Sequence, residues 1–207
     1  MVDCNPAETP HQQGFYLTTG MCPKSDDEKV RMQQVPYAEL VGSLNWISSN
    51  TRPDISAAVG TLCRFIGNPG QQHWKAAQRV LRYLSGAKGQ GILFERQHTD
   101  EEAIGFSDAN WAGDTDTRRS TIGYIFMLAG GLIAWKSKLQ TSSSLSSVEA
   151  EYVALCGAVL EAVWLRQLLA ELGFPAKNLT VIAEDNKRCI VASSNNRTDI
   201  RTKHIEV

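Results

Sequence analysis

The chain is long enough for one large domain or two small ones, and its composition is that of a folded protein. It has 207 residues, of which 43% are hydrophobic, so it can bury a substantial core. The 21 Lys and Arg residues stand against 22 Asp and Glu residues, which gives a formal net charge of -1. This balance excludes a globally basic nucleic-acid-binding protein, and only a local basic patch could serve that purpose.

The cysteines form no metal-binding or disulfide pattern. They stand at positions 4, 22, 63, 156 and 189, without a Cys-x-x-Cys pair or the paired Cys/His spacing of a zinc site. The first residues contain no charged region followed by an apolar core, and no apolar run is long enough to cross a membrane. We therefore expect an intracellular protein that is neither secreted nor embedded in a membrane.

The N-terminal half predicts a leader followed by a small helical module. Residues 1–34 contain three prolines and an acidic run with little apolar periodicity, which predicts an extended or poorly ordered leader. Helical patterns follow over residues 37–48, 54–66 and 71–84. Pro53 suits the first turn of the second helix, and Gly86 suits the end of the third. A compact helical module is therefore expected over residues 35–98.

The remaining residues, 99–207, predict an α/β domain. The stretches AIGFSD, TIGYIFML and LIAWKSK have the pattern of antiparallel strands, with Gly130-Gly131 as the turn between the second and the third. A long helix over residues 146–172 ends at Gly173. The stretch LTVIAED then predicts a fourth strand before a helix over residues 187–193. The order βββαβα predicts a mixed sheet with flanking helices.

Basic side chains gather in two places. On the predicted helix 71–84, Lys75, Arg79 and Arg82 fall within roughly 60° of one another on a helical wheel, so they could follow a row of phosphates. The alternative is an ordinary solvated helix face. Four more basic residues lie around the predicted hairpins: Arg118, Arg119, Lys136 and Lys138. They could contact a nucleic-acid backbone, or they could be the charged residues that protect strand edges from aggregation.

Two aspartates stand at the ends of predicted strands. Asp108 ends the first strand in GFSDANW, and Asp185 ends the fourth in VIAEDN. Ligands gather at strand ends in open α/β sheets, so the two acids could face the same crevice. The alternative for each is ordinary turn chemistry.

Glu149 is the third candidate acid, and it has two interpretations. Ser146 and Glu149 have the spacing of a capping box, in which the glutamate would be structural. On the helical wheel, however, Glu149 lies within roughly 80° of an apolar stripe, whereas Glu151 points the opposite way. That stripe consists of Tyr152, Val153, Cys156, Val159, Leu160 and Val163.

A buried acid is costly unless something compensates its charge. A divalent cation shared with two other carboxylates is one such partner, and Mg²⁺ prefers hard oxygen ligands. Two such ions about 4 Å apart can activate a water molecule and stabilise the leaving oxygen of a phosphodiester. The spacing of Asp108, Glu149 and Asp185 therefore suggests a site for phosphoryl transfer.

These residues carry a resemblance to a known family. The string FSDANWAGDTDTRRSTIGYIFMLAGGLIAWKSKLQTSSSLSSVEAEYVAL, followed by EDN and RTKHIE, is similar to the ribonuclease H domain of Pol polyproteins from copia-type LTR retrotransposons. The stretch VPYAELVGSLNWISSNTRPDISAAVGTLCRFIGNPGQQHWKAAQRVLRYLSG resembles the region that joins the reverse-transcriptase palm to that domain. The resemblance covers nearly the whole chain.

The resemblance implies a ribonuclease H-like fold, with a mixed sheet of the five-strand type whose last element is truncated. It implies hydrolysis of the RNA strand of an RNA-DNA hybrid with Mg²⁺, for which Mn²⁺ could substitute. The remainder of a Pol polyprotein is a possible partner, no membrane or small-molecule cofactor is implied, and the location would be a cytoplasmic particle or the nucleus. The implied metal ligands and catalytic residues are Asp108, Glu149, Asp185 and Glu206, with Lys203 as a further contact to the hybrid.

Two positions depart from the family pattern. Glu206 stands where the family has an aspartate, and the longer side chain displaces a carboxylate that near-octahedral Mg²⁺ coordination would hold closely. Asp199 stands roughly where the family usually has a histidine that could assist proton transfer. Together with the truncated last element, these departures predict lowered or lost activity. The alternative function is a catalytically inactive ribonuclease H-like remnant that binds nucleic acid or has no activity.

Overall fold

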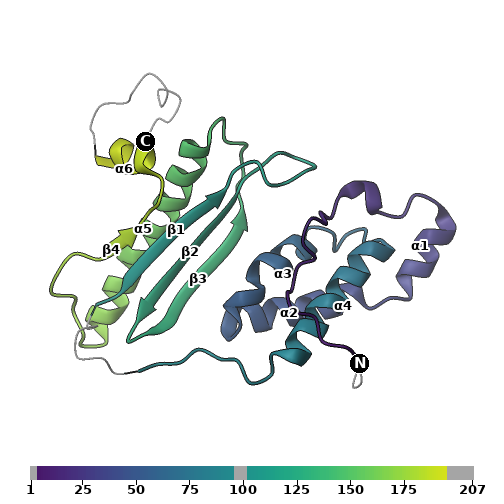
Figure 1. Ribbon diagram of the computed structural model, residues 1–207, viewed down its shortest axis with the longest axis horizontal. Helices are drawn as coiled ribbons and strands as arrows, with labels where there is room; N and C mark the ends of the chain where they lie inside the picture. Colours follow the sequence, from purple (N-terminus) through teal and green to yellow (C-terminus); the bar gives the residue numbers. More distant parts are fainter. Residues whose placement is uncertain (1–3, 96–101, 195–207) are drawn as a thin grey trace. The chain divides into compact units, whose positions relative to one another are not determined.

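The computed structural model describes residues 4–95 and 102–194, and the chain divides into two compact units, Met1–Ile92 and Leu93–Val207 (Figure 1). The first unit is helical and the second contains the sheet, so each is described by itself. Three positions singled out in the sequence, Asp199, Lys203 and Glu206, lie outside the described residues.

The helical unit begins earlier than the sequence predicts. Its elements are two 3-10 helices and four α-helices: η1 (Thr19–Met21), α1 (Asp26–Gln33), α2 (Tyr37–Asn50), η2 (Pro53–Ile55), α3 (Ser56–Cys63) and α4 (Gln71–Gly86). The prediction of an extended leader is wrong at α1. The acidic run forms the first turn of that helix, where Ser25 and Glu28 make a capping box and negative charge is favourable.

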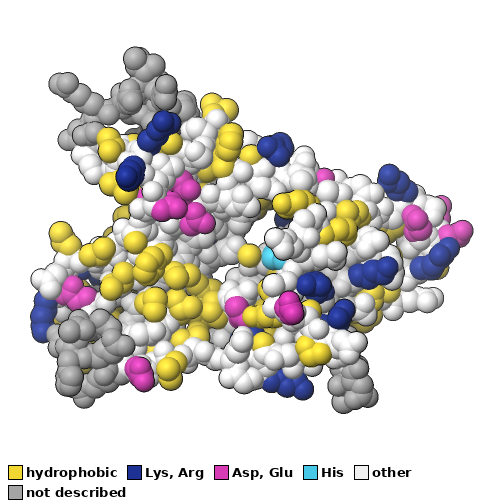
Figure 2. All heavy atoms as spheres, in the orientation of Figure 1, with side chains coloured by type: hydrophobic (Ala, Val, Ile, Leu, Met, Phe, Trp, Pro, Cys, Tyr) yellow, Lys and Arg dark blue, Asp and Glu magenta, His cyan; other side chains and the backbone are white. Residues whose placement is uncertain are grey.

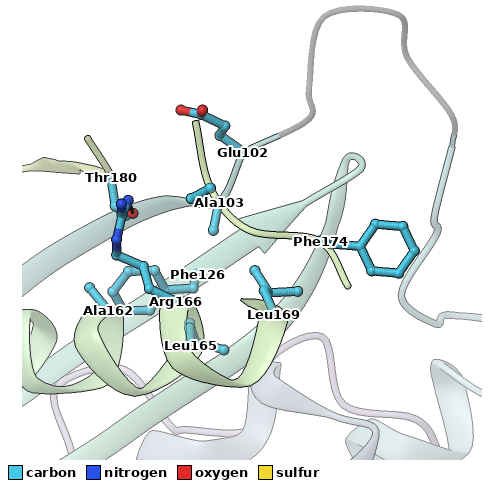
Figure 3. Close-up of a pocket in the computed structure, with 10 residues that line it drawn as sticks. Glu102, Ala103, Phe126, Ala162, Leu165, Arg166, Leu169, Phe174 and Thr180 are labelled. Carbon is cyan, nitrogen blue, oxygen red and sulfur yellow. Dashed lines mark hydrogen bonds between the residues drawn. The ribbon is translucent and has the colours of Figure 1, made fainter. Parts of the chain in front are cut away.

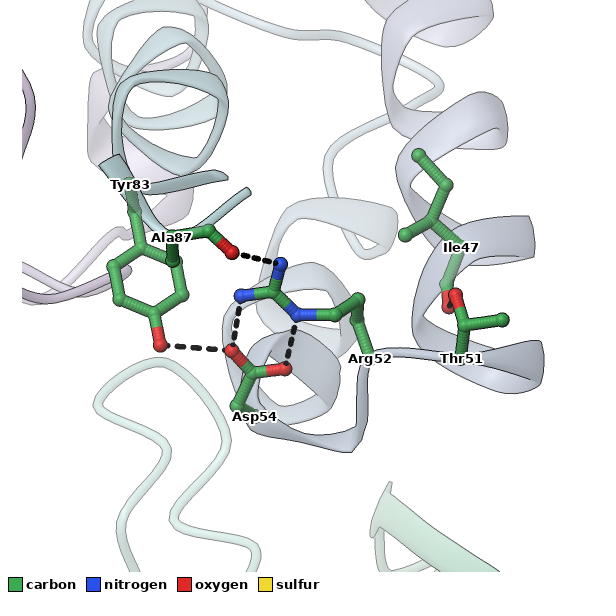
Figure 4. Close-up of polar contacts among 6 residues, drawn as sticks. All are labelled: Ile47, Thr51, Arg52, Asp54, Tyr83 and Ala87. Carbon is green, nitrogen blue, oxygen red and sulfur yellow. Dashed lines mark hydrogen bonds and ion pairs between the residues drawn. The ribbon is translucent and has the colours of Figure 1, made fainter. Parts of the chain in front are cut away.

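An arginine ties the start of η2 to the end of α4 (Figure 4). The Arg52 guanidinium donates two hydrogen bonds to the Asp54 carboxylate, at 2.9 and 2.7 Å, and a third to the Ala87 carbonyl at 3.0 Å. The Tyr83 hydroxyl donates to the same carboxylate at 2.7 Å. A planar guanidinium suits this bidentate arrangement, which fixes two distant parts of the unit against each other.

Gly70 stands where two backbone segments of the helical unit meet. Its N–H donates to Nδ1 of buried His73 at 2.8 Å, and the other ring nitrogen lies 3.2 Å from the Thr18 carbonyl. Because Nδ1 accepts a hydrogen bond, the neutral ring carries its proton on Nε2 and donates it to Thr18. A Cβ atom at position 70 would overlap the Met21 carbonyl oxygen, so only glycine fits.

We expect Gly70→Ala to lower the free energy of unfolding by about 1–3 kcal/mol, because the added methyl group must displace backbone. Gly67→Ala is the matched control, since a Cβ there meets nothing within 4 Å. Urea denaturation followed by circular dichroism measures both variants. Equal denaturation midpoints for the two would contradict the close approach at Gly70.

The second unit contains a four-stranded mixed sheet in its described part. The strands are β1 (Ile104–Asn110), β2 (Thr121–Leu128), β3 (Gly131–Leu139) and β4 (Val181–Ala183), in the order β3-β2-β1-β4. β1 is antiparallel to β2 and parallel to β4. The hairpin between β2 and β3 turns at Ala129 and Gly130, both with positive φ, one residue earlier than the sequence predicts.

In the part of this unit that the structure describes, two helices accompany the sheet, α5 (Ser147–Glu171) and α6 (Lys187–Ser194). α5 lies along one face of the sheet (Figure 1). Its buried side chains are mostly small, and they include Glu151: Ala150, Glu151, Ala154, Ala158, Ala162 and Leu165. The predicted core-facing stripe is therefore wrong, since the larger Val153, Val159, Leu160 and Val163 are exposed.

By length and composition alone, α5 could cross a membrane. Its packing shows a different use. Its alanine stripe faces β1 and β2, and the Tyr124 hydroxyl of β2 donates to the Glu161 carboxylate of α5 at 2.8 Å. We therefore describe α5 as the helix that covers one face of the sheet.

The face of the sheet opposite α5 carries exposed apolar side chains. Residues along β1 alternate between exposed and buried, as expected for a strand covered on one side only. Ile104 and Phe106 are each 42% exposed, and Val181 pairs with Ile104 in the neighbouring strand. Apolar side chains gather over the sheet in Figure 2.

The segment that leads from α5 into β4 is fixed by a side chain of α5 (Figure 3). Arg166 donates to the Asn178 carbonyl at 2.7 Å and to the Thr180 hydroxyl at 3.1 Å. The Asn178 N–H donates to the Glu102 carboxylate at 2.7 Å. These contacts hold the chain immediately before Val181, where β4 begins.

Candidate metal centre

Three carboxylates from three elements meet at one end of the sheet. Asp108 belongs to β1, Glu151 to the first turns of α5, and Asp185 follows β4. One oxygen atom from each of them lies within 4.8 Å of the other two. Figure 2 shows acidic side chains gathered at the surface close to α6. Hard carboxylate oxygens at this spacing suit a divalent cation such as Mg²⁺.

The pairing of β1 with β4 explains why the two aspartates meet. The strands run parallel, and Phe106 pairs with Ala183 as the last pair of the ladder. Asp108, which still lies within β1, and Asp185, which lies beyond β4, each stand two residues after that pair, towards the carboxyl ends of the two strands. The sequence-based expectation that the two strand ends face a common crevice agrees with this placement.

Glu151 is the buried member of the group. The residue is 7% exposed, and its Oε2 atom has no hydrogen-bond partner in the described part of the chain. Burial, and after it the negative charges of Glu184, Asp108 and Asp185, raise the pKa of Glu151 to about 7, although a hydrogen bond from the Ala109 N–H acts in the opposite direction. A buried oxygen without a partner, beside two other carboxylates, is an arrangement that a cation would stabilise.

Glu149 is not part of this group, and its contacts lie at the start of α5. Its Oε2 accepts a hydrogen bond from the Leu145 N–H at 2.6 Å, and its own N–H donates to the Ser146 hydroxyl at 3.2 Å. Ser146 is the residue that caps α5, and Glu149 reaches back to Leu145, one residue before the partner that a capping box would use. Glu149 is therefore structural, as the capping interpretation expects, and the metal-binding position expected of it is taken by Glu151. The signal in the sequence was the run of alanines at every fourth position beside Glu151, which allows a helix to lie close to a sheet.

The loop after β1 lies beside the segment that leads into α5. The Trp111 indole N–H donates to the Ser144 carbonyl at 3.2 Å, and the Ala112 N–H donates to the Ser120 hydroxyl at 3.0 Å. The loop carries Arg118, which is exposed, and Arg119, which is half-buried. Lys136 and Lys138 are exposed on β3. Of these four basic residues, the two arginines follow Asp108 most closely along the chain.

The basic residues of α4 are only partly available to a ligand. Lys75 is exposed, but Arg79 donates to the carbonyl and hydroxyl of Thr9, both at 3.1 Å. Arg82 donates to the Asn5 carbonyl at 2.7 Å. The expected stripe therefore also holds the N-terminal segment. Carbonyl oxygens are neutral, so these hydrogen bonds orient the two guanidinium groups without removing their charge.

The fold and the carboxylate group define a mixed α/β protein with a candidate divalent-cation site. A retrovirus-related Pol polyprotein from transposon TNT 1-94 of Nicotiana tabacum is 42% identical over 207 residues, which are 100% of this chain and 15% of that protein. The corresponding polyprotein from transposon RE2 of Arabidopsis thaliana is 38% identical over 205 residues, 99% of this chain and 14% of that protein.

A third relative is much shorter. Secreted RxLR effector protein 161 of Plasmopara viticola is 49% identical over 134 residues, 65% of this chain and 94% of that protein. No family model matches the chain, and no solved structure matches it. The chain belongs to the same family as these relatives, and over its whole length it is homologous to copia-type retrotransposon Pol polyproteins.

The raised pKa of Glu151 predicts a pH dependence of stability in the absence of divalent cations. Below about pH 4.5 the residue is protonated in both the folded and the unfolded chain. As the pH rises towards 7, only the unfolded chain loses this proton readily, so the folded state becomes less stable relative to it. In EDTA, the thermal midpoint should fall more between pH 5 and pH 8 for the wild type than for Glu151→Gln. An equal fall of the thermal midpoint in the wild type and in Glu151→Gln would contradict this environment for Glu151.

Proposed function

We propose that this chain carries the ribonuclease H part of a retrotransposon Pol polyprotein and that it hydrolyses the RNA strand of RNA-DNA hybrids endonucleolytically. The observation that carries the proposal is the convergence of Asp108, Glu151 and Asp185, with one buried oxygen that lacks a partner among the described residues. Homology to copia-type Pol polyproteins supports it, although the chain covers only 15% of the tobacco relative. The helical unit would then belong to the region before this domain in the polyprotein.

The residues fit a Mg²⁺ site, for which Mn²⁺ could substitute. Asp108, Glu151 and Asp185 would hold the metal, because each offers a carboxylate oxygen at the shared position. When bound, the metal supplies an activated water molecule and stabilises the charge on the leaving oxygen of the phosphodiester. Glu206 remains a proposed fourth acid from outside the described residues.

The three acids differ in how far they are exposed, which gives the site an open side and a closed side. Glu151 is buried at the base, whereas Asp108 and Asp185 are exposed. A phosphodiester would therefore approach from the side of the two exposed aspartates. The Ala109 backbone N–H donates a hydrogen bond to Glu151 and so orients its carboxylate. This hydrogen bond would hold the Glu151 carboxylate in place before substrate arrives, which would reduce the reorganisation needed during the reaction.

The partner that we propose is the RNA-DNA hybrid, in an intracellular setting. Exposed Arg118, in the loop after β1, would contact a phosphate near the site, and exposed Lys75 would contact one from the helical unit. The cysteines of the chain are all free thiols, which suits a reducing compartment. The rest of a Pol polyprotein would be the second partner.

Cleavage assays test the assignment of the acids. With a labelled RNA-DNA hybrid and Mg²⁺, we expect Glu151→Gln and Asp108→Asn to lower the cleavage rate by about 100-fold or more, because each removes a proposed ligand. Glu149→Gln is the matched control on the same helix, and its cleavage rate should stay close to that of the wild type. Loss of cleavage in Glu149→Gln, with cleavage retained in Glu151→Gln, would contradict the assignment of Glu151 as the metal-binding acid of α5. Hybrid binding without cleavage by the wild-type chain would support the inactive remnant instead.

The contribution of the basic residues is measurable through salt. Replacing Lys75, Arg79 and Arg82 by glutamine should flatten the dependence of hybrid affinity on salt, by about 0.7–0.9 in the logarithmic slope for each phosphate that is no longer neutralised. Lys75→Gln alone separates the neutralisation of a phosphate from the anchoring of the N-terminal segment by the two arginines. Affinity measured between 50 and 200 mM salt gives the slopes. If the triple variant has the same salt dependence of affinity as the wild type, these three residues of α4 form an ordinary solvated helix face.

A further inference from the structure

We propose that Ser107 and Glu184 form a clamp that positions Asp108 and Asp185 in the site. Neither residue is among the three acids, and each directly precedes one of the aspartates in the sequence. The role assigned to them is positioning, because they act on the site through their neighbours. The inference rests on the proposed function of that site.

The register of the sheet brings the two residues together. β1 and β4 pair through Ile104 with Val181, Gly105 with Ile182, and Phe106 with Ala183. Continuing this register by one residue places Ser107 opposite Glu184, and the next step places Asp108 opposite Asp185. The ladder itself has ended at that point, so backbone pairing no longer holds the two strand ends together.

A side-chain hydrogen bond takes over where the ladder ends. The Ser107 hydroxyl donates to Oε2 of Glu184 at 2.8 Å. The other carboxylate oxygen, Oε1, accepts from the Asn186 N–H at 3.1 Å. Hydrogen bonds to an ionised carboxylate are stronger than those between neutral groups, and Ser107 is only 7% exposed. Both oxygens of Glu184 are therefore engaged.

The segment beyond Asp185 is held as well. The Asn186 side chain accepts hydrogen bonds from the N–H groups of Arg188 and Cys189, at 3.1 and 3.2 Å, and so caps α6. Asp185 thus lies between a residue that is clamped to β1 and a residue that caps a helix. In β1, Ser107 is buried and Asp108 is exposed, so the clamp holds the strand from inside while the aspartate faces outward.

Glu184 is a fourth carboxylate near the site, but its contacts differ from those of a ligand. It is not among the acids whose oxygens meet within 4.8 Å. Its two oxygens receive hydrogen bonds from a hydroxyl and a backbone N–H, whereas Oε2 of Glu151 has no partner among the residues that the structure describes. The contacts therefore give Glu184 the task of holding the strand end and leave cation binding to the other three acids.

Two variants break the clamp from opposite sides, and a third preserves it. Ser107→Ala removes the donor, and Glu184→Ala removes the acceptor from a half-buried position beyond the strand, where folding is easier to retain. Glu184→Gln keeps a carbonyl oxygen and a group that can still hydrogen-bond to Ser107 while removing the charge. Circular dichroism and thermal unfolding of the full chain confirm that each variant folds.

We expect Ser107→Ala and Glu184→Ala each to weaken Mn²⁺ binding by about tenfold, as measured by calorimetric titration, because outer contacts of this kind orient metal ligands. Cleavage of the hybrid should show a lower kcat with an unchanged KM. Glu184→Gln should stay within about threefold of the wild type in both measurements. The double alanine variant should be no worse than either single variant, because both remove the same interaction.

The possible results separate the clamp from the function of the site. Wild-type affinity and kcat in both alanine variants would overturn the clamp and leave the proposed function intact. Loss of Mn²⁺ binding in Glu184→Gln, with Ser107→Ala unaffected, would also overturn it, because Glu184 would then be a ligand. A wild-type chain that neither binds Mn²⁺ nor cleaves the hybrid would overturn the proposed function, and the positioning role with it.

Discussion

The repulsion among Asp108, Glu151 and Asp185 is the constraint on which the second unit depends. Three carboxylates within 4.8 Å of one another, one of them buried, stay together only if the surrounding structure holds each of them independently. β1 supplies one through the sheet, α5 supplies the second through its close packing, and the segment between β4 and α6 supplies the third. The shift in the pKa of Glu151 reflects this burial together with the enforced proximity of the other acids.

Close packing of α5 is what brings a helix residue into the site. Alanines at every fourth position let the helix lie near β1 and β2, and Gly157 stands where even an added Cβ would be in van der Waals contact with Tyr124. Larger residues on that side would push the helix away, and a glutamate of ordinary length would then fall short of the aspartates. The bulky aliphatic residues of α5 therefore face outward, at a cost in exposed apolar surface.

Much of the architecture could be predicted from the sequence because its signals are local. The helix predicted over 71–84 is observed as α4, and the strand predicted over 121–128 is observed as β2. The choice between Glu149 and Glu151 is not a local matter. α5 is apolar on nearly all sides, so the positions of its large hydrophobic residues point to the face that is in fact exposed. Packing against the sheet decides that the alanine face, which carries Glu151, is the buried one. The sequence does not predict α1, because its capping box lies in a stretch with little apolar periodicity.

Because the parallel pairing of β4 is short, the arrangement of the site depends strongly on the number of residues in this part of the chain. β4 pairs with β1 through three residues, Val181, Ile182 and Ala183, and the chain before them is fixed through Arg166. Gaining or losing one residue here would turn successive side chains to the opposite face and exchange the places of Glu184 and Asp185. A single in-frame codon insertion at this point would therefore separate the three carboxylates while leaving every acidic residue in the sequence.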